Sequence, residues 1–137
     1  MPKQDPLIQF KNKVRVRVCG ILEHKECILM IRHSGLVEKD VWLAPGGGVQ
    51  FGETIEEALI REFKEETNLD IQVSDFLGIN EHIKNDLHAI EIYHKVVYKK
   101  GTINLGSDPE LEPHNQILKD IKYLKKEHAI QYIPSLQ

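Results

Sequence analysis

Polar and apolar residues alternate strictly near the start of the chain, over residues 13–19. Three valines occupy one face of this segment and two arginines occupy the other, a period-two pattern that is typical of a half-buried strand. A second apolar run, at 27–31, follows a polar break, and the two segments are expected to pair as a hairpin. The residues expected to face the core from the first strand are Val14, Val16 and Val18.

Residues 54–67 carry the clearest helical pattern in the chain. Thr54 is a suitable N-cap, and Glu57 three residues later completes a capping box, in which each side chain accepts a backbone N–H. Asn68 stands where a helix often ends in a left-handed residue, a conformation that asparagine tolerates better than most. The apolar positions at helical spacing, which are expected to face the core, are Ile55, Ala58, Leu59 and Phe63.

The remaining apolar runs predict further strands around this helix. Pro45 and the glycines after it are expected to end the short run 41–44, because both residue types interrupt regular structure. A turn is expected at Asn85-Asp86, and residues 106–115 have the composition of a long polar loop. The order of strands, an early helix, more strands and a late helix predicts a mixed α/β domain. The expected strands are 71–79, 89–98 and 117–124, and the late helix is 125–130.

Three glutamates of the predicted helix, Glu62, Glu65 and Glu66, stand at positions i, i+3 and i+4. Their carboxylates share one face, where like charges cost about 0.2–0.5 kcal/mol per pair in an isolated helix. A glycine-rich loop, residues 46–52, precedes the helix and is followed by a fourth acid, Glu53. Oxygen-only ligands favour a hard cation, and Mg²⁺ is the usual one where phosphates complete the coordination shell. The alternative for such a cluster is a solvated acidic helix face.

Gly47, Glu53, Arg61-Glu62-Phe63, Glu65-Glu66 and Leu69 are separated by five, seven, one and two residues. This spacing favours the metal site, because it resembles a Nudix box. The chain is therefore similar to the Nudix (MutT-like) hydrolases. The resemblance implies an α/β/α sandwich with a mixed central sheet, formed by residues 1–137 as a single domain with the box at about 47–69. Two positions depart from the family pattern, since Asn68 replaces a glycine and Gln50 replaces a glutamate.

The resemblance implies a divalent-metal site within the box. Glu62, Glu65 and Glu66 would coordinate Mg²⁺, for which Mn²⁺ is a substitute. The carbonyl oxygen of Gly46, just before the box, is a candidate backbone ligand. Loss of the acidic residue at Gln50 removes one charge from the loop, so the number of metal ions is left open.

The catalytic set implied by the resemblance is Glu53, Arg61, Glu65 and an acid from outside the box. Arg61 would bind a carboxylate such as Glu53, since the guanidinium fork matches the two oxygens of a carboxylate. Family members often add an outlying acid as metal ligand or general base. Glu112 is favoured for this role, ahead of Glu110, with a box glutamate as a further choice. The alternative for both residues is a solvent-exposed acidic loop.

The expected activity is hydrolysis of a phosphoanhydride bond in a nucleoside diphosphate linked to another moiety. Family members for ADP-ribose tend to carry a proline shortly after the box, and those for dinucleoside polyphosphates tend to carry a tyrosine there. Residues 81–87 contain neither, which leaves a nucleoside triphosphate or a nucleotide sugar as the expected substrate. The competing hypothesis is a non-catalytic nucleotide-sensing Nudix module, a type that typically loses box carboxylates.

The composition fits an ordinary globular domain, because 41% of the 137 residues are hydrophobic and 28% are charged. A net charge of −3 argues against broad nucleic-acid binding, which usually requires a basic face. No apolar run reaches the length of a membrane span and none resembles a signal peptide, so a cytoplasmic protein is expected. The expected partner is a small nucleotide, and a homodimer stays open. The two cysteines, Cys19 and Cys27, are expected as buried reduced thiols.

The aromatic and imidazole side chains give weaker signals. The seven histidines include no close pair at helical metal spacing, which argues against a zinc site. His33, His82 and His88 are interpreted as scattered surface residues, with contact to a substrate as the alternative. Trp42, beside the glycine loop, is interpreted as a core residue, with stacking on a base as the alternative.

Overall fold

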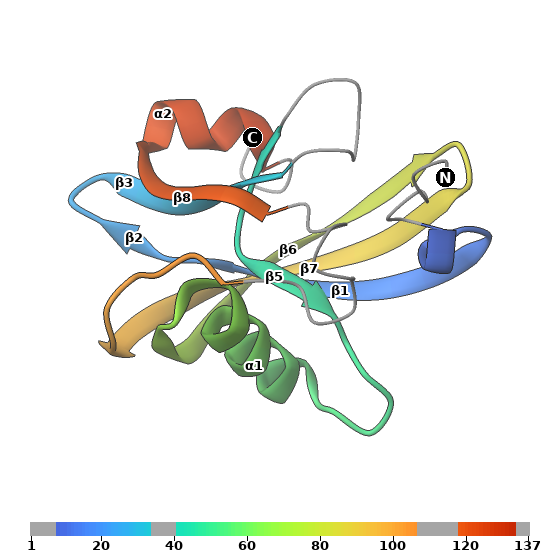
Figure 1. The fold of residues 1–137 in the computed structure, drawn as a ribbon, viewed down its shortest axis with the longest axis horizontal. Helices are drawn as coiled ribbons and strands as arrows, with labels where there is room; N and C mark the ends of the chain where they lie inside the picture. Colours follow the sequence, from blue (N-terminus) through green and yellow to red (C-terminus); the bar gives the residue numbers. More distant parts are fainter. Residues whose placement is uncertain (1–7, 34–40, 107–117, 134–137) are drawn as a thin grey trace, which may run out of the picture.

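The computed structural model describes residues 8–33, 41–106 and 118–133, which form two four-stranded sheets and the helices around them (Figure 1). The strands of the first sheet are β1 (Lys13–Ile21), β5 (Gly46–Gly48), β6 (Asp70–Lys84) and β7 (Leu87–Lys100), in the order β5-β1-β7-β6. Strands β1 and β7 are parallel, whereas the other neighbours are antiparallel. The sheet is therefore mixed, as the sequence predicts.

A second sheet is built around β3 (Cys27–His33), with β2 (Glu23–His24), β4 (Val41–Leu43) and β8 (Leu118–Lys125). The predicted hairpin is confirmed only at its tip, where β2 and β3 pair antiparallel (Glu23↔Ile28 and His24↔Cys27), because β1 itself lies in the other sheet. Strand β1 is paired on both sides, by β5 and β7, and has no edge left for β3. The chain leaves β1 at Leu22 and crosses to the second sheet, where the short strand β2 pairs with β3 instead.

The elements form three layers, with the first sheet in the middle (Figure 1). Helix α1 (Ile55–Thr67) lies on one face, and the second sheet with α2 (Lys126–Ala129) lies on the other. Alternation along β1 explains this arrangement, since Val18 packs in the cluster with α1 whereas its neighbour Cys19 packs with β3. This architecture confirms the α/β class. Two short 3-10 helices, η1 (Ile8–Phe10) and η3 (Ile130–Tyr132), complete the described elements.

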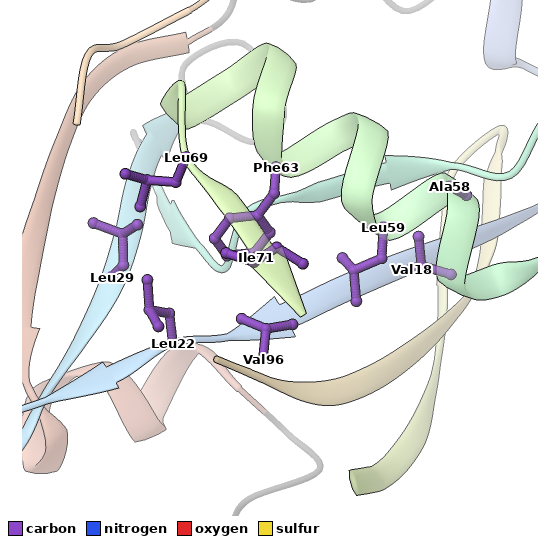
Figure 2. Packing of buried hydrophobic residues seen from close by; sticks show 9 residues of the cluster. All are labelled: Val18, Leu22, Leu29, Ala58, Leu59, Phe63, Leu69, Ile71 and Val96. Atoms are coloured by element: carbon purple, nitrogen blue, oxygen red, sulfur yellow. The ribbon is translucent and has the colours of Figure 1, made fainter. Parts of the chain in front are cut away.

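Helix α1 begins and ends as its sequence predicts. Thr54 and Glu57 form the capping box, with the Glu57 amide donating to Thr54 Oγ1 over 3.0 Å. Asn68 ends the helix in the left-handed region at φ 66°, and its side-chain amide donates to the Thr102 carbonyl oxygen over 3.0 Å. The expected core residue Ile55 is exposed instead. The helix residues that do reach the core are Ala58, Leu59 and Phe63, which pack against Val18, Ile71 and Val96 (Figure 2).

The expected burial of the valine face of β1 is only partly correct. Val18 is buried, but Val14 and Val16 are exposed. Helix α1 packs over the Val18 end of the strand and leaves the other end of the same face uncovered. Alternation identifies which side chains share a face, but another element has to cover that face before it becomes buried.

The glycines after Pro45 were expected to end regular structure, and this prediction is wrong. Gly46–Gly48 forms β5, which pairs with β1 in the register Cys19↔Gly46 to Arg17↔Gly48. A Cβ added at Gly46 would lie 1.9 Å from the Val18 carbonyl oxygen, a distance that no side chain can adopt. Glycine is therefore required here for close backbone approach, and that approach creates the strand.

The strands after α1 are longer than predicted. β6 and β7 form an antiparallel hairpin that turns at Asn85-Asp86, as expected, but β6 continues to Lys84 instead of ending at 79, and β7 runs from Leu87 to Lys100 instead of 89–98. Both cysteines are free, and Cys19 is buried whereas Cys27 is only partly buried. None of the helices in the described parts of the chain combines the length and apolar character needed to cross a membrane.

Candidate active site

The backbone of the glycine strand β5 is in direct contact with glutamate side chains of helix α1. The Gly46 amide donates to Glu66 Oε1 over 2.9 Å. Gly47 lies against the carboxylate of Glu62, since a Cβ added at this glycine would be 2.4 Å from Glu62 Cδ. The absence of side chains on β5 thus lets two glutamates of α1 bring their carboxylates up to the sheet backbone. Both glutamates are buried.

Arg61 lies at the centre of this cluster and binds four neighbours. Its Nε and Nη2 donate to the two oxygens of Glu53 over 2.7 and 2.9 Å, the bidentate pair that the resemblance implies. Nη2 also donates to the Gly48 carbonyl oxygen over 3.1 Å. Nη1 contacts Glu62 at 2.8 Å and Glu65 at 3.3 Å. One guanidinium therefore ties the loop, the glycine strand and the helix together.

The electrostatics of the loop keep Glu53 ionised. Hydrogen bonds from Arg61, assisted by one from the Gln50 amide, lower the pKa of the Glu53 carboxyl to about 2. The pKa of Arg61 is raised in turn, chiefly by its hydrogen bonds to Glu53. Gln50, which replaces a glutamate of the family pattern, therefore still contributes through its backbone N–H.

The charge balance of the cluster fits a divalent cation. Three carboxylates, those of Glu53, Glu62 and Glu65, contact a single guanidinium. A fourth carboxylate, that of Glu66, accepts the Gly46 amide on the neighbouring strand, and Glu62 and Glu66 are buried. Carboxylate oxygens are the ligands that Mg²⁺ prefers. Within the described ranges, however, no three acidic, histidine or cysteine side chains converge on one point as a metal site. The Arg61 guanidinium lies between the carboxylates of Glu53, Glu62 and Glu65. The ligand set Gly46, Glu62, Glu65 and Glu66 therefore stays a prediction.

A second polar cluster, which the sequence analysis missed, lies on the other face of the sheet. Arg17 Nη1 donates to Glu91 Oε2 over 2.6 Å, and Asn80 Nδ2 donates to Glu91 Oε1 over 3.0 Å. Burial disfavours the charged form of Arg17, but the acidic groups around it, Cys19, Glu91 and Glu66 among them, raise its pKa. Arg17 thus adds positive potential behind Glu66. Only its place on the polar side of the alternating strand was visible in the sequence.

His33, at the end of β3, is buried and not the surface residue expected. Neither ring nitrogen has a hydrogen-bond partner in the structure as described. Burial, together with the nearby Arg17, lowers the pKa of the His33 imidazole to about 3. His82 is exposed as expected, and partly exposed His88 contacts Glu81 over 2.8 Å.

Replacing His33 by leucine is expected to raise the free energy of unfolding by about 1 kcal/mol at pH 7, because two unpaired polar atoms leave the interior. The gain should grow as the pH falls from about 6.5 towards about 3. In that window the unfolded wild-type chain binds a proton that the folded chain excludes, so acidification destabilises the wild type. Urea denaturation at several pH values measures this, with the exposed His82→Leu as control. Equal acid sensitivity of His33→Leu and the wild type would contradict the assignment.

Trp42 packs at the margin of the core, so the core position favoured by the sequence analysis is only partly correct. It is half-buried and packs against the cluster that contains Ile28 and Met30. The ammonium group of Lys122 lies 4.9 Å from the centre of the indole ring, a cation–π contact. The ring is therefore already covered on one side by β8.

Glu112 and Glu110 lie outside the described residues, but the segment that leads to them is fixed against the site. The Gly106 amide donates to the Glu66 carbonyl oxygen over 2.8 Å, and the Asn104 amide donates to the Thr67 carbonyl oxygen over 3.0 Å. A Cβ at Gly106 would lie 1.7 Å from the Glu65 carbonyl oxygen. The chain thus passes beside the two glutamates immediately before residue 107.

Comparison with known proteins agrees with this geometry. A family model of the NUDIX domain matches residues 11–133. The chain belongs to the NUDIX domain family. The match includes both sheets, both helices and the Arg61-centred cluster.

Two curated relatives share substantial sequence with this NUDIX domain. The ADP-ribose pyrophosphatase of Methanocaldococcus jannaschii is 38% identical over 95 residues, which are 68% of this chain and 56% of that protein. The nucleoside triphosphatase NudI of Salmonella heidelberg is 39% identical over 64 residues, 44% of this chain and 45% of that one. The aligned residues thus make up only about half of either relative.

Solved structures of the family share the fold. The MutT protein from Methanosarcina mazei Go1 superposes with a TM-score of 0.70 at 19% identity, covering 88% of this chain and 83% of that one. A NUDIX hydrolase from Nitrosomonas europaea gives 0.68 at 17% identity, covering 90% and 80%. The predicted Nudix architecture is thereby confirmed.

Proposed function

We propose that this chain is a divalent-metal-dependent hydrolase that cuts a phosphoanhydride bond in a nucleoside diphosphate linked to another moiety. The observation that carries the proposal is the Arg61-centred cluster, in which three carboxylates contact one guanidinium and a fourth, that of Glu66, accepts an amide of the side-chain-free strand beside it. Such an excess of negative charge is costly unless a cation neutralises it. A cation held there could in turn bind the oxygens of a pyrophosphate group.

The residues of the cluster have different proposed roles in hydrolysis. Glu62, Glu65 and Glu66, with the Gly46 carbonyl oxygen, would hold Mg²⁺ or Mn²⁺. The ion would neutralise charge on the pyrophosphate oxygens and lower the pKa of the attacking water. Water supplies the oxygen of the new P–O bond, the bridging oxygen leaves with the other phosphate, and a base accepts the proton. Phosphoryl transfer depends mainly on such positioning and charge stabilisation.

Arg61 and Glu53 act as the frame of the site. Glu53 is ionised and accepts hydrogen bonds from Arg61 through both of its carboxylate oxygens. Arg61 then holds Glu62 and Glu65 by the same nitrogen, Nη1, which fixes the spacing of their carboxylates. A cation that enters the cluster would take over part of these contacts. We therefore assign the pair to positioning of the metal ligands.

The proposed substrates are nucleoside triphosphates and nucleotide sugars. The names of the relatives from Salmonella heidelberg and Methanocaldococcus jannaschii support both groups, since one is called a nucleoside triphosphatase and the other an ADP-ribose pyrophosphatase. ADP-ribose is therefore a specific second candidate substrate, although residues 81–87 lack the proline that family members for ADP-ribose tend to carry. Small nucleotides are the proposed partners, and the two free cysteines fit the proposed cytoplasmic location.

The test is a screen of nucleoside triphosphates, nucleotide sugars and ADP-ribose with Mg²⁺ and Mn²⁺, followed by product identification. A nucleoside monophosphate with pyrophosphate identifies a triphosphatase, and a nucleoside monophosphate with a sugar phosphate identifies a nucleotide-sugar hydrolase. We expect excess chelator to abolish turnover and added metal to restore it. Undiminished turnover in chelator would refute the metal-dependent mechanism. Tight nucleotide binding without any turnover would favour the non-catalytic sensing module.

Glu112 is the proposed general base, with Glu110 as its rival. The hydrogen bond from Gly106 to the Glu66 backbone supports this choice, because it brings the preceding segment beside the metal ligands. Glu112→Gln should lose both rate and the acidic limb of the pH–rate profile in saturating metal, whereas Glu110→Gln should retain both. The reverse result would assign the role to Glu110. No change in either variant would place the base elsewhere, with Glu81 or a metal-bound water acting with Glu53 as the next candidates.

A further inference from the structure

A groove with a volume of about 550 Å³ opens where β1 leaves the first sheet. Strand β1 pairs with β7 only as far as Lys95, and in the described part of the chain β7 continues past this point beside β6 alone. Residues 22–24 line one side of the groove and residues 95–98 line the other, along the edge of β7 that β1 leaves free. We call it the edge groove. Its floor is apolar, because Leu22 and Val96 are buried in the cluster under α1 (Figure 2).

The edge groove is separate from the candidate active site. Strand β5, which carries the glycines of that site, pairs with the edge of β1 that faces away from β7. Its register places Gly46 opposite Cys19, before the point at which β1 ends. None of the described residues that line the edge groove belongs to the Arg61-centred cluster. A molecule bound in the groove would therefore not occupy the proposed metal ligands.

Aromatic rings line both sides of the edge groove. His24 of β2 and Tyr123 of β8 contact each other with their ring centroids 5.9 Å apart, and Tyr98 comes from β7. The Tyr98 hydroxyl donates to the Gly101 carbonyl oxygen over 2.9 Å, which fixes the direction of its ring. Burial, and after it the nearby Tyr98, raises the pKa of Tyr123, so its hydroxyl stays protonated and able to donate. The groove thus offers ring faces on which a planar ring can stack.

The charges around the edge groove include a cation without an ionic partner. Glu23 of β2 lies with its Oε1 3.5 Å from Lys126 Nζ, so this carboxylate is already paired. Lys95 of β7 is exposed and forms none of the ion pairs found among the described residues. An ammonium group binds phosphate as a point charge, whereas the arginine fork matches the geometry of carboxylates. The groove therefore favours a ligand with a phosphate group.

We propose that the edge groove binds a planar ring that carries a phosphate group, a class to which the nucleoside monophosphates belong. The ring would lie between the His24–Tyr123 pair and Tyr98, above the apolar floor, and the phosphate would bind Lys95. Ligand sites of this kind measure about 300–1,000 Å³ and combine apolar walls with a few polar groups, so the groove has a suitable size and lining. This proposal does not depend on the proposed hydrolase activity.

Titration of the nitrogen-15-labelled protein with AMP, CMP, GMP and UMP in turn, in excess chelator, tests the proposal. Heteronuclear NMR spectra should show the largest changes at the amides of residues 22–24, 95–98 and 123, which form the groove. The free nucleoside and inorganic phosphate should each bind at least about tenfold more weakly, because each lacks one of the two recognised groups. Absence of changes in these segments with all four nucleotides would overturn the proposal. Changes confined to residues 46–66 would do so too, because they would place the nucleotide in the candidate active site.

Substitution of Lys95 tests the recognition of the phosphate. Lys95→Gln should raise the dissociation constant of the bound nucleotide at least about tenfold, because the charged hydrogen bond is lost. Lys99→Gln is the matched control, since Lys99 is an exposed lysine of the same strand that does not line the groove, and it should leave the affinity unchanged. Equal weakening by both variants would show attraction by the general charge of β7 and overturn the assignment of Lys95.

Substitution of Tyr123 tests the stacking of the ring. Tyr123→Leu should weaken binding about tenfold, because it removes a ring face. Tyr123→Phe keeps the ring and should retain most of the affinity. Thermal melting of all variants verifies that each remains folded. Unchanged affinity in a folded Tyr123→Leu protein would overturn the position proposed for the ring.

Discussion

Glu65→Gln is expected to lower turnover by at least about 100-fold, a barrier increase of about 2.7 kcal/mol, while the protein remains folded. Glu65 makes the loosest contacts with Arg61, at 3.3 and 3.4 Å, against 2.8 Å for Glu62. Its carboxylate is thus the one most readily turned towards a cation. Glutamine keeps the length of the side chain but removes the charge that would hold the ion. Steady-state rates in saturating Mg²⁺ measure the effect.

Glu57→Gln is the matched control for this experiment. Glu57 is on the same helix, but its carboxylate accepts the Thr54 amide in the capping box at 3.4 Å, away from the cluster. We expect a small loss of stability, up to about 1 kcal/mol, and little change in rate. If Glu65→Gln retains more than about a tenth of the wild-type rate, the residue is not a principal ligand. A decrease of the same size in Glu57→Gln would show that the loss is structural.

Gly47→Ala is expected to reduce turnover by about 10- to 100-fold, or about 1.4–2.7 kcal/mol of barrier, with little loss of secondary structure. The new methyl group would lie 2.4 Å from Glu62 Cδ and 2.5 Å from Glu62 Oε2. Because the obstacle is a side-chain terminus and not backbone, the protein can fold by displacing that carboxylate. The displaced Glu62 would lose its 2.8 Å contact with Arg61 and its place among the ligands.

Gly48→Ala separates this effect from a general intolerance of β5. The nearest atom to a Cβ at Gly48 is Arg15 Nη2 at 3.3 Å, the end of a flexible side chain. Near wild-type turnover is expected. Measurement of kcat and of the metal concentration for half-maximal rate in both variants decides the matter. A Gly47→Ala enzyme with unchanged kcat and unchanged metal requirement would contradict the assigned position of Glu62.

Local signals in the sequence predicted local structure well. The capping box, the left-handed Asn68 and the shared face of the glutamates all depend on residues within four positions of one another. The Arg61–Glu53 pair followed from the family resemblance and is present. The same reasoning failed at β5, because three glycines form a strand only when β1 lies beside them. Pairing with a distant strand leaves no local pattern.

The sequence also did not show which part of an apolar strand face another element covers. Val14, Val16 and Val18 alternate identically, yet only Val18 lies under α1. The Arg17–Glu91 pair joins residues 74 positions apart, and buried His33 of β3 lies near Arg17 of the other sheet. Such contacts are set by topology, in particular by the crossing of the chain to the second sheet at Leu22.

Asn68 links the end of α1 to the segment that follows β7, and so bears on how often that segment opens locally. A glycine, as in the family pattern, would adopt the same left-handed conformation but could not donate to Thr102. Local opening of residues 101–106 must break that bond together with those of the Asn104 and Gly106 amides. Slow hydrogen exchange at these two amides would therefore report how rarely the segment detaches. The departure from the family sequence thus adds a hydrogen bond that limits how often residues 101–106 detach from the end of α1.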